Sequence, residues 1–207
     1  MTKASTIQSV DALRERVRPP ARMSVDKVID HIDDLAAEFI AATPFIIISS
    51  VRADGQVDLS PRGDPPGFMK VLDRKTLAIP DRPGNRRADT FTNIISNPEV
   101  GIICMIPGHE DTLRLAGRAQ LVDEHALAET MVVAGHTPPL IIKVTVNRLL
   151  SHCAKAMVRS HIWDPEHWPD GAKVPSHGKM VKTHGALSQT LDEMETLVLD
   201  DKLNNLY

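Results

Sequence analysis

The sequence predicts a mainly β protein with helices, of the α+β class, built as a closed antiparallel barrel. Short apolar segments follow one another through residues 45–146 with turn signals between them. Short hairpins join these segments and only a few helical stretches interrupt them, which favours a barrel over a doubly wound parallel sheet. The 207 residues, 42% of them hydrophobic, are enough for one core. We therefore expect one domain with appendages.

The first elements are a helix and a hairpin. Apolar side chains recur at helical spacing through residues 24–42, which predicts a helix. Residues 45–51 are typical of a buried strand. Asp54-Gly55 predicts a hairpin turn ahead of the alternating Val57 and Leu59. A strand meander is expected to begin here.

A strand–turn–helix unit follows an irregular stretch. The stretch covers residues 60–68, and a strand is expected at residues 76–80. After the turn at 81–85 comes a helix, for which Asn85 is a plausible N-cap and Asn97-Pro98 the end.

The barrel is expected to close with three further strands, at residues 100–106, 112–122 and 140–146. The Pro- and Gly-rich sequence from residue 164 onward predicts a surface arm, with a last helix at 186–203. Trp163 and Trp168 are expected to anchor that arm. The expected division is an N-terminal extension (1–23), a barrel domain (24–163) and a C-terminal arm with a helix (164–207).

Composition excludes several function classes. A net charge of −3 gives no general affinity for nucleic acid or for an anionic membrane. No apolar run approaches the ~20 residues that span a bilayer, and Cys104 and Cys153 lack the spacing of a cysteine zinc site. We therefore expect a cytoplasmic protein with two reduced thiols. The common nucleotide-binding, hydrolase and zinc-protease motifs are absent, and His161 and His167 form only a loose pair, so we assign no metal site.

The most informative segment is residues 80–87, which is expected to place Arg86 and Arg87 in the first turn of a helix. The helix dipole disfavours each cation there by ~0.3–1 kcal/mol. A bound phosphate reverses the argument, because backbone amides, the Asn85 side chain and two guanidinium groups would surround it. Each charge-assisted bond contributes ~1.5–3 kcal/mol. The open alternative is that the arginines face solvent or pair with Asp81 and Asp89.

Two further segments carry candidate basic groups. Residues 60–68 have the composition of a rigid ligand-facing loop around Arg62, or of a surface turn with an Arg62–Asp64 ion pair. His152, Lys155 and Arg159 share one side of an amphipathic helix if residues 150–160 are helical. That face either receives an anion, or is solvated or paired with acidic residues of the arm.

Residues 30–165 resemble the pyridoxamine 5′-phosphate oxidase-like FMN-binding split-barrel flavoproteins. The closest points are four stretches: 60–68, 79–87 leading into Asn97-Pro98, 112–119, and 152–159 before Trp163-Asp164-Pro165. The resemblance implies a six-stranded split barrel that forms a homodimer, with one FMN in each of two grooves at the subunit interface. Nothing in it implies a nucleic-acid or membrane partner.

The resemblance also implies roles for residues. Arg86 and Arg87 match the pair that grips the phosphate, and Pro80-Asp81 match the strand end beside the cofactor. Thr112 stands where the oxidase has a glutamine near the flavin. The set expected to bind the cofactor is Ser60, Arg62, Gly63, Pro80, Asp81, Arg82, Asn85, Arg86, Arg87, Thr112, Arg114, Lys155 and Arg159.

The function implied is that of an FMN-dependent oxidoreductase acting on a small molecule, with no side chain obliged to act as acid or base. Residues 60–68 do not match the cofactor strand of the true pyridoxamine phosphate oxidases, so vitamin B6 oxidation is not carried over. Two different functions stay open beside it: a non-catalytic protein that stores or senses a flavin or haem, and a deazaflavin-dependent reductase.

Overall fold

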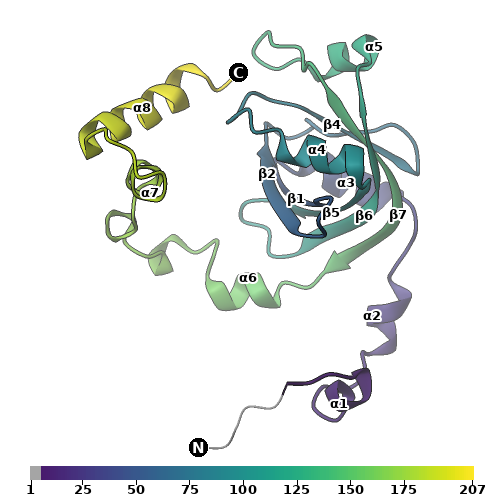
Figure 1. Cartoon of the computed structure of the whole chain (residues 1–207). Coiled ribbons are helices and arrows are strands. Elements are labelled where there is room, and N and C mark those ends of the chain that lie inside the picture. The colour runs from purple at the N-terminus through teal and green to yellow at the C-terminus, as the bar shows by residue number, and fades with distance from the viewer. Residues whose placement is uncertain (1–5) are drawn as a thin grey trace, which may run out of the picture.

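The computed structural model describes residues 6–207, and residues 1–5 of the expected N-terminal extension lie outside them (Figure 1). One antiparallel sheet curls into a barrel in the order β2-β1-β5-β6-β7-β4-β3. The expected α+β split barrel is confirmed, with seven strands in place of six. The strands are β1 Phe45–Val51, β2 Val57–Gly63, β3 Lys70–Val71, β4 Thr76–Pro80, β5 Glu99–Met105, β6 Thr112–Val122 and β7 Ile141–His152.

The core lies inside this curled sheet. Burial alternates along β1 and β5 with the period of two that a strand imposes. Ile46, Ile48 and Cys104 are among the side chains fully removed from solvent. The register between β6 and β7 shifts at Ala116/Gly117, where a bulge bends the long strands.

The helix expected at residues 24–42 is wrong as a single element. The structure has a short helix, α2 (Arg22–Asp26), and a separate one, α3 (Asp34–Ala42), which begins after the cap of Asp33. Between them, Ile29 exchanges two backbone hydrogen bonds with Leu149 of β7, at 3.0 and 2.7 Å. Backbone pairing with the sheet therefore interrupts the helical pattern.

Two boundaries near the candidate site also differ from expectation. Ser60 to Gly63 belong to β2 and not to a loop; β2 ends the strand order, and an edge strand tolerates Pro61. The next helix, α4 (Asp89–Ser96), begins after Ala88, so Arg86 and Arg87 precede it and Asn85 is not its N-cap. Left-handed backbone at Arg86 and Ala88 prevents an earlier start.

The amphipathic helix expected at residues 150–160 is wrong in its first half. Strand β7 continues past the expected end at Val146, and His152 pairs with Thr112. Only α6 (Lys155–Ser160) is helical, so His152 does not share a helix face with Lys155 and Arg159. Strand β7 continues beyond the point where its own apolar alternation fades, because it pairs with the long strand β6.

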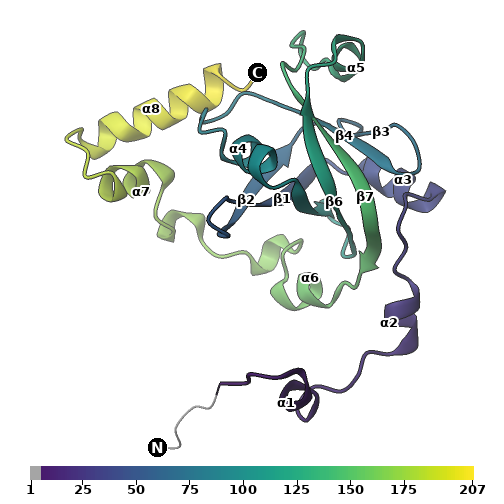
Figure 2. The same cartoon turned by 45° about the vertical axis from the view of Figure 1, so that its right-hand side comes forward.

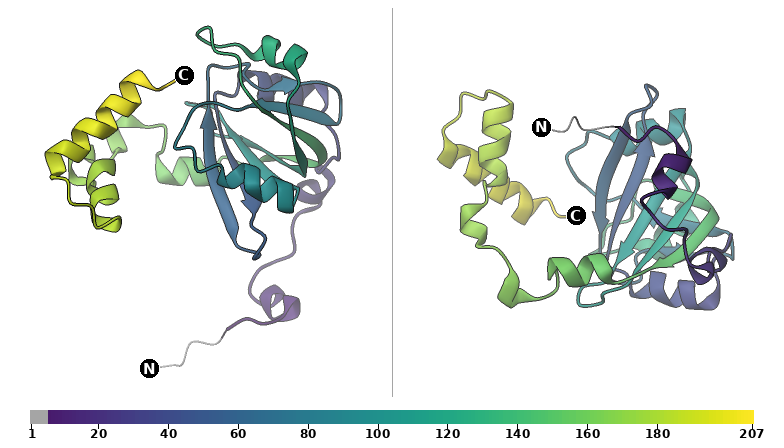
Figure 3. Two further views of the ribbon diagram at one scale, coloured as in Figure 1. Left: turned by 45° about the horizontal axis from the view of Figure 1, so that its top comes forward. Right: turned by 90° about the horizontal axis from the view of Figure 1, so that it is seen from below.

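The C-terminal arm leaves the barrel after α6 and carries two packed helices (Figures 2 and 3). These are α7 (His177–His184) and α8 (Leu191–Asn204), so the last helix is confirmed with a later start, at the capping box of Thr190 and Glu193. Trp163 anchors the arm by donating Nε1–H to the His109 carbonyl at 2.9 Å. The shorter elements are α1 Val10–Arg14, α5 His125–Ala128 and the 3-10 helices η1 Glu129–Met131, η2 Pro165–His167 and η3 Gly171–Lys173.

None of the helices within residues 6–207 is both long and apolar enough to cross a membrane.

Candidate functional site

The candidate site is a cavity of about 620 Å³ between the edge strand β2, the end of β4 and the loop that leads into α4. This size lies within the range of pockets that bind cofactors and other small molecules, about 300–1,000 Å³. Nine of the thirteen expected residues line it: Ser60, Arg62, Gly63, Pro80, Asp81, Arg82, Asn85, Arg86 and Arg87. Phe68 and Phe91 also line the cavity and give it apolar surface.

The loop over this cavity has an unusual backbone. Arg86 and Ala88 adopt φ values of 58° and 56°, in the left-handed region that side chains disfavour. Such conformations cost of order 1–3 kcal/mol each and cluster at binding sites. Left-handed residues in a turn also occur in nests, where successive backbone N–H groups form a concavity for an anion. The Asn85 side chain supports the loop by accepting from the Arg87 N–H at 3.0 Å.

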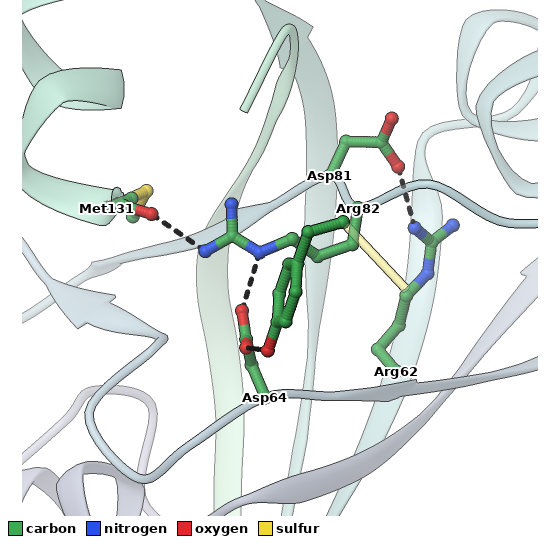
Figure 4. Close-up of polar contacts among 6 residues, drawn as sticks. Arg62, Asp64, Asp81, Arg82 and Met131 are labelled. Atoms are coloured by element: carbon green, nitrogen blue, oxygen red, sulfur yellow. Dashed lines mark hydrogen bonds and ion pairs between the residues drawn. The ribbon is translucent and has the colours of Figure 1, made fainter. Parts of the chain in front are cut away.

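Arg62 reaches across the cavity wall from β2 to the end of β4. Its Nη1 donates to Asp81 Oδ1 at 3.1 Å, and both side chains are mostly buried (Figure 4). The guanidinium also lies over the Phe91 ring, 5.1 Å from its centroid. The Arg62–Asp64 ion pair of a surface turn does not form, because Arg62 pairs with Asp81 and Asp64 pairs with Arg82.

Arg82 is held from two sides. Its Nε donates to Asp64 Oδ2 at 2.5 Å and its Nη2 to the Met131 carbonyl at 2.7 Å (Figure 4). The Asp64 side chain is only 1% exposed, so this ion pair is shielded from water. Two guanidinium nitrogens of the site, Arg62 Nε and Arg82 Nη1, are buried without a hydrogen-bond partner in the described part of the chain. Unsatisfied buried donors of this kind call for an acceptor.

The two loop arginines differ in their partners. Arg87 Nε donates to Asp89 Oδ2 at 2.7 Å, and this hydrogen bond raises the pKa of the Arg87 guanidinium. The pairing considered for Arg87 and Asp89 is therefore confirmed. Arg86 is exposed and forms no ion pair with any residue between 6 and 207. Of the two, Arg86 keeps its full donor capacity for a ligand.

The other four expected residues lie outside this cavity. Thr112 is buried at the start of β6, and Arg114 Nη1 lies 3.5 Å from His152 Nδ1 on the neighbouring strand. Lys155 and Arg159 of α6 line a second hollow of about 400 Å³, together with Asp111 and the exposed Cys153. The cavity of a single chain is therefore lined by nine of the thirteen expected residues.

The sequence interpretation did not identify Asp64 as the partner of Arg82, nor Tyr207, whose hydroxyl donates to Asp64 Oδ1 at 2.7 Å. Asp64 stands inside the stretch 60–68, whose composition suggested a ligand-facing loop, but Tyr207 is 143 residues away. No local pattern connects positions so far apart.

The histidines noted as a loose pair do meet in the arm. The rings of His161 and His167 stack with their centroids 4.2 Å apart. One atom able to bind a metal from each of His161, Asp164 and His167 lies within 4.8 Å of the others. Asp164 Oδ1 caps η2 and Oδ2 lies 2.7 Å from His167 Nδ1. We therefore assign the cluster to the fold of the arm.

Most of the barrel matches a known protein family. The family model described as pyridoxamine 5′-phosphate oxidase matches residues 32–153. A search of curated proteins found no match.

Three solved structures are similar to part of this chain. HupZ from Group A Streptococcus is 19% identical, with 58% of this chain and 93% of that chain covered and a TM-score of 0.47. A putative pyridoxamine 5′-phosphate oxidase from Lactobacillus delbrueckii is 16% identical, with 59% and 95% covered and a TM-score of 0.46. An FMN-binding protein from Syntrophomonas wolfei is 7% identical, with 70% and 97% covered and a TM-score of 0.46. These scores assign no ligand to this chain.

Proposed function

Because the chain belongs to the pyridoxamine 5′-phosphate oxidase family, whose model matches more than half of it, we propose that it binds FMN in the cavity beside β2. We further propose that it acts as an FMN-dependent oxidoreductase on a small molecule. Bound FMN supplies hydride transfer at its N5 atom, and the protein supplies binding, orientation and charge. No side chain is assigned as an acid or base.

The observation that carries this proposal is the loop before α4. Arg86 and Ala88, on either side of Arg87, have left-handed backbone, and the Asn85 side chain braces the turn. Arg86 has no acidic partner in the described chain. A phosphate group provides several acceptors for such an arrangement, and charge-assisted hydrogen bonds to it are about twice as strong as neutral ones. The strain of the loop is then offset when the anion binds.

The walls of the cavity fit a flavin in their chemistry. Phe68 and Phe91 provide apolar surface, and Arg62 and Arg82 hold buried positive charge that two aspartates only partly engage. The unpartnered Arg62 Nε and Arg82 Nη1 indicate that both guanidinium groups have donor capacity beyond their ion pairs. Groups of this kind are suited to polarise the oxygen atoms of a ring system.

We propose that the functional unit is a homodimer with two equivalent sites. Thr112, Arg114, Lys155 and Arg159 lie outside the cavity of their own chain, so a second copy is the means by which they would reach a cofactor. Arg159 would then either help with the phosphate or receive an anionic substrate. Dilution should release FMN and separate the subunits together; a monomer that binds FMN at full strength would contradict the shared site.

Turnover separates the enzyme from a protein that stores or senses its cofactor. The reduced holoprotein should be reoxidised at a steady rate when oxygen or another acceptor is supplied. A tightly held but inert flavin would favour the sensor. A haem in the purified protein would favour a haem-binding role, and a deazaflavin would favour a deazaflavin-dependent reductase. The composition and the thiols also support a cytoplasmic location, which stays a prediction.

A further inference from the structure

The C-terminal arm returns to the barrel at Tyr207. Figures 1 and 2 show α7 and α8 standing away from the barrel and the chain after α8 turning back toward it. Tyr207 ends this segment with its hydroxyl 2.7 Å from Asp64 Oδ1. Its ring also stacks on His136, with the centroids 6.3 Å apart and 26° between the planes. His136 belongs to the loop between η1 and β7.

Asp64 connects Tyr207 to the wall of the cavity. Each oxygen of this carboxylate has one partner: Oδ1 accepts from Tyr207, and Oδ2 accepts from Arg82 Nε at 2.5 Å. Arg82 lines the cavity, and its side chain is 14% exposed. Its Nη2 is bound by the Met131 carbonyl of η1, in the segment that precedes the His136 loop. Tyr207 therefore contacts Asp64, which supports the Arg82 guanidinium, and His136, in the loop that follows the other support, Met131.

We propose that Tyr207 is a positioning residue: it docks the arm on the barrel through Asp64 and thereby holds Arg82 in the wall of the cavity. The proposal rests on the proposed function only in naming the cavity as the cofactor site. The contact between Tyr207 and Asp64 involves protein atoms alone.

The buried carboxylate explains why this contact matters. With the arm docked, the Asp64 side chain is 1% exposed, so its carboxylate depends on donors from the protein and not on bulk water. Without that donor Asp64 Oδ1 loses its partner, and the carboxylate then competes with a ligand for the remaining nitrogens of Arg82. Binding at the cavity and docking of the arm are then coupled, and each favours the other to the same extent.

The same contact leaves a spectroscopic signature. The hydrogen bond to Asp64, assisted by burial and by the negative charge, raises the pKa of the Tyr207 hydroxyl, which Arg82 opposes. The titratable groups that face the ring are Asp64, Arg82 and His136. Because the folded pKa is raised, docking is at full strength below the ordinary tyrosine pKa of about 10 and is lost as pH rises through the folded value.

The first test uses the fact that Tyr207 is the single tyrosine of the sequence. Its ionisation can be followed in the protein without FMN by the ultraviolet absorption of the phenolate. We expect titration above the ordinary tyrosine range in the wild type and a return to that range in Asp64→Asn, which removes the charge. A wild-type tyrosine that titrates in the ordinary range would overturn the proposal.

The second test leaves both residues of the buried Asp64–Arg82 ion pair unchanged. Tyr207→Phe keeps the ring but removes the donor, and Leu206→Ala is the matched control at an exposed neighbour. Hydrogen exchange of the 205–207 segment and of the loop around His136 should become about tenfold faster or more in Tyr207→Phe, as expected for one lost bond to a charged acceptor. Equal exchange in Tyr207→Phe and wild type would contradict docking.

The effect on the cavity is measured separately. Tyr207→Phe should weaken FMN binding several-fold while Leu206→Ala does not. Unchanged affinity, together with a raised tyrosine pKa, would show docking without positioning and would overturn the coupling. If neither protein binds FMN, the proposed function fails, but the tyrosine titration still decides the contact.

Discussion

Replacing Arg86 with alanine should weaken FMN binding without weakening riboflavin binding. Arg86 is the loop arginine that has no acidic partner in the described chain, and it lies in the left-handed turn over the cavity. One charge-assisted hydrogen bond is worth ~1.5–3 kcal/mol. Loss of one such bond corresponds to a rise of roughly 10- to 150-fold in the Kd of FMN.

The assay is a titration of flavin fluorescence with FMN and with riboflavin, which lacks the phosphate. The ratio of the two affinities isolates the phosphate contribution, because changes in the isoalloxazine site affect both ligands. Arg86→Lys should keep part of the preference, since the charge survives without the planar fork. Arg87→Ala should have a smaller effect, because Arg87 is already engaged with Asp89.

Arg118→Ala is the matched control, since it removes an exposed arginine paired with Glu99 outside the cavity. The reasoning is refuted if Arg86→Ala and wild type show the same preference for FMN over riboflavin. It is also refuted if Arg118→Ala loses as much of that preference as Arg86→Ala.

Three further outcomes are expected. A Cβ at Gly117 would lie 2.1 Å from the Thr145 carbonyl oxygen, so Gly117→Ala should lower the free energy of unfolding by about 3 kcal/mol or more in urea denaturation. A neutral effect would contradict this close approach of the two strands. Burial raises the pKa of the Cys104 thiol to about 12, so a thiol reagent at mild pH should label only the exposed Cys153 until the chain unfolds. Because the pKa of Cys104 is raised in the folded protein, the buried neutral thiol contributes fully to the free energy of unfolding below the ordinary thiol pKa of about 8.5. This contribution declines as the pH rises from there toward 12. Arg159→Ala should either release FMN or impair only substrate-driven reduction, and no change in either would make α6 ordinary surface.

The strands of the barrel could be predicted because their pattern is local. Apolar alternation and turn residues gave the positions of β1, β4, β5 and β6 almost to the residue. The single helix at residues 24–42 was wrong because Ile29 bonds to Leu149, far along the chain. Helical spacing in the sequence does not reveal such a competing partner.

Nine of the thirteen residues expected to bind the cofactor line one cavity, but the geometry of that cavity was not predicted. The stretch from Pro80 to Arg87 does line the cavity, yet it does so as a loop with left-handed residues and not as a helix N-terminus. Backbone strain at Arg86 and Ala88 has no sequence signature, since neither is a glycine. The pairing of Arg62 with Asp81 was not predicted, because β2 and the end of β4 meet only in the folded chain.

The most direct test of the account is the identity of the bound molecule. The protein is purified, loaded with excess FMN and freed of unbound ligand, and the ligand released on denaturation is weighed by mass spectrometry and counted by absorbance. The account predicts a yellow protein that yields FMN at about one molecule per chain, as two equivalent sites in a dimer require. A protein that retains no FMN after loading, or that yields a haem or a deazaflavin in its place, would contradict it.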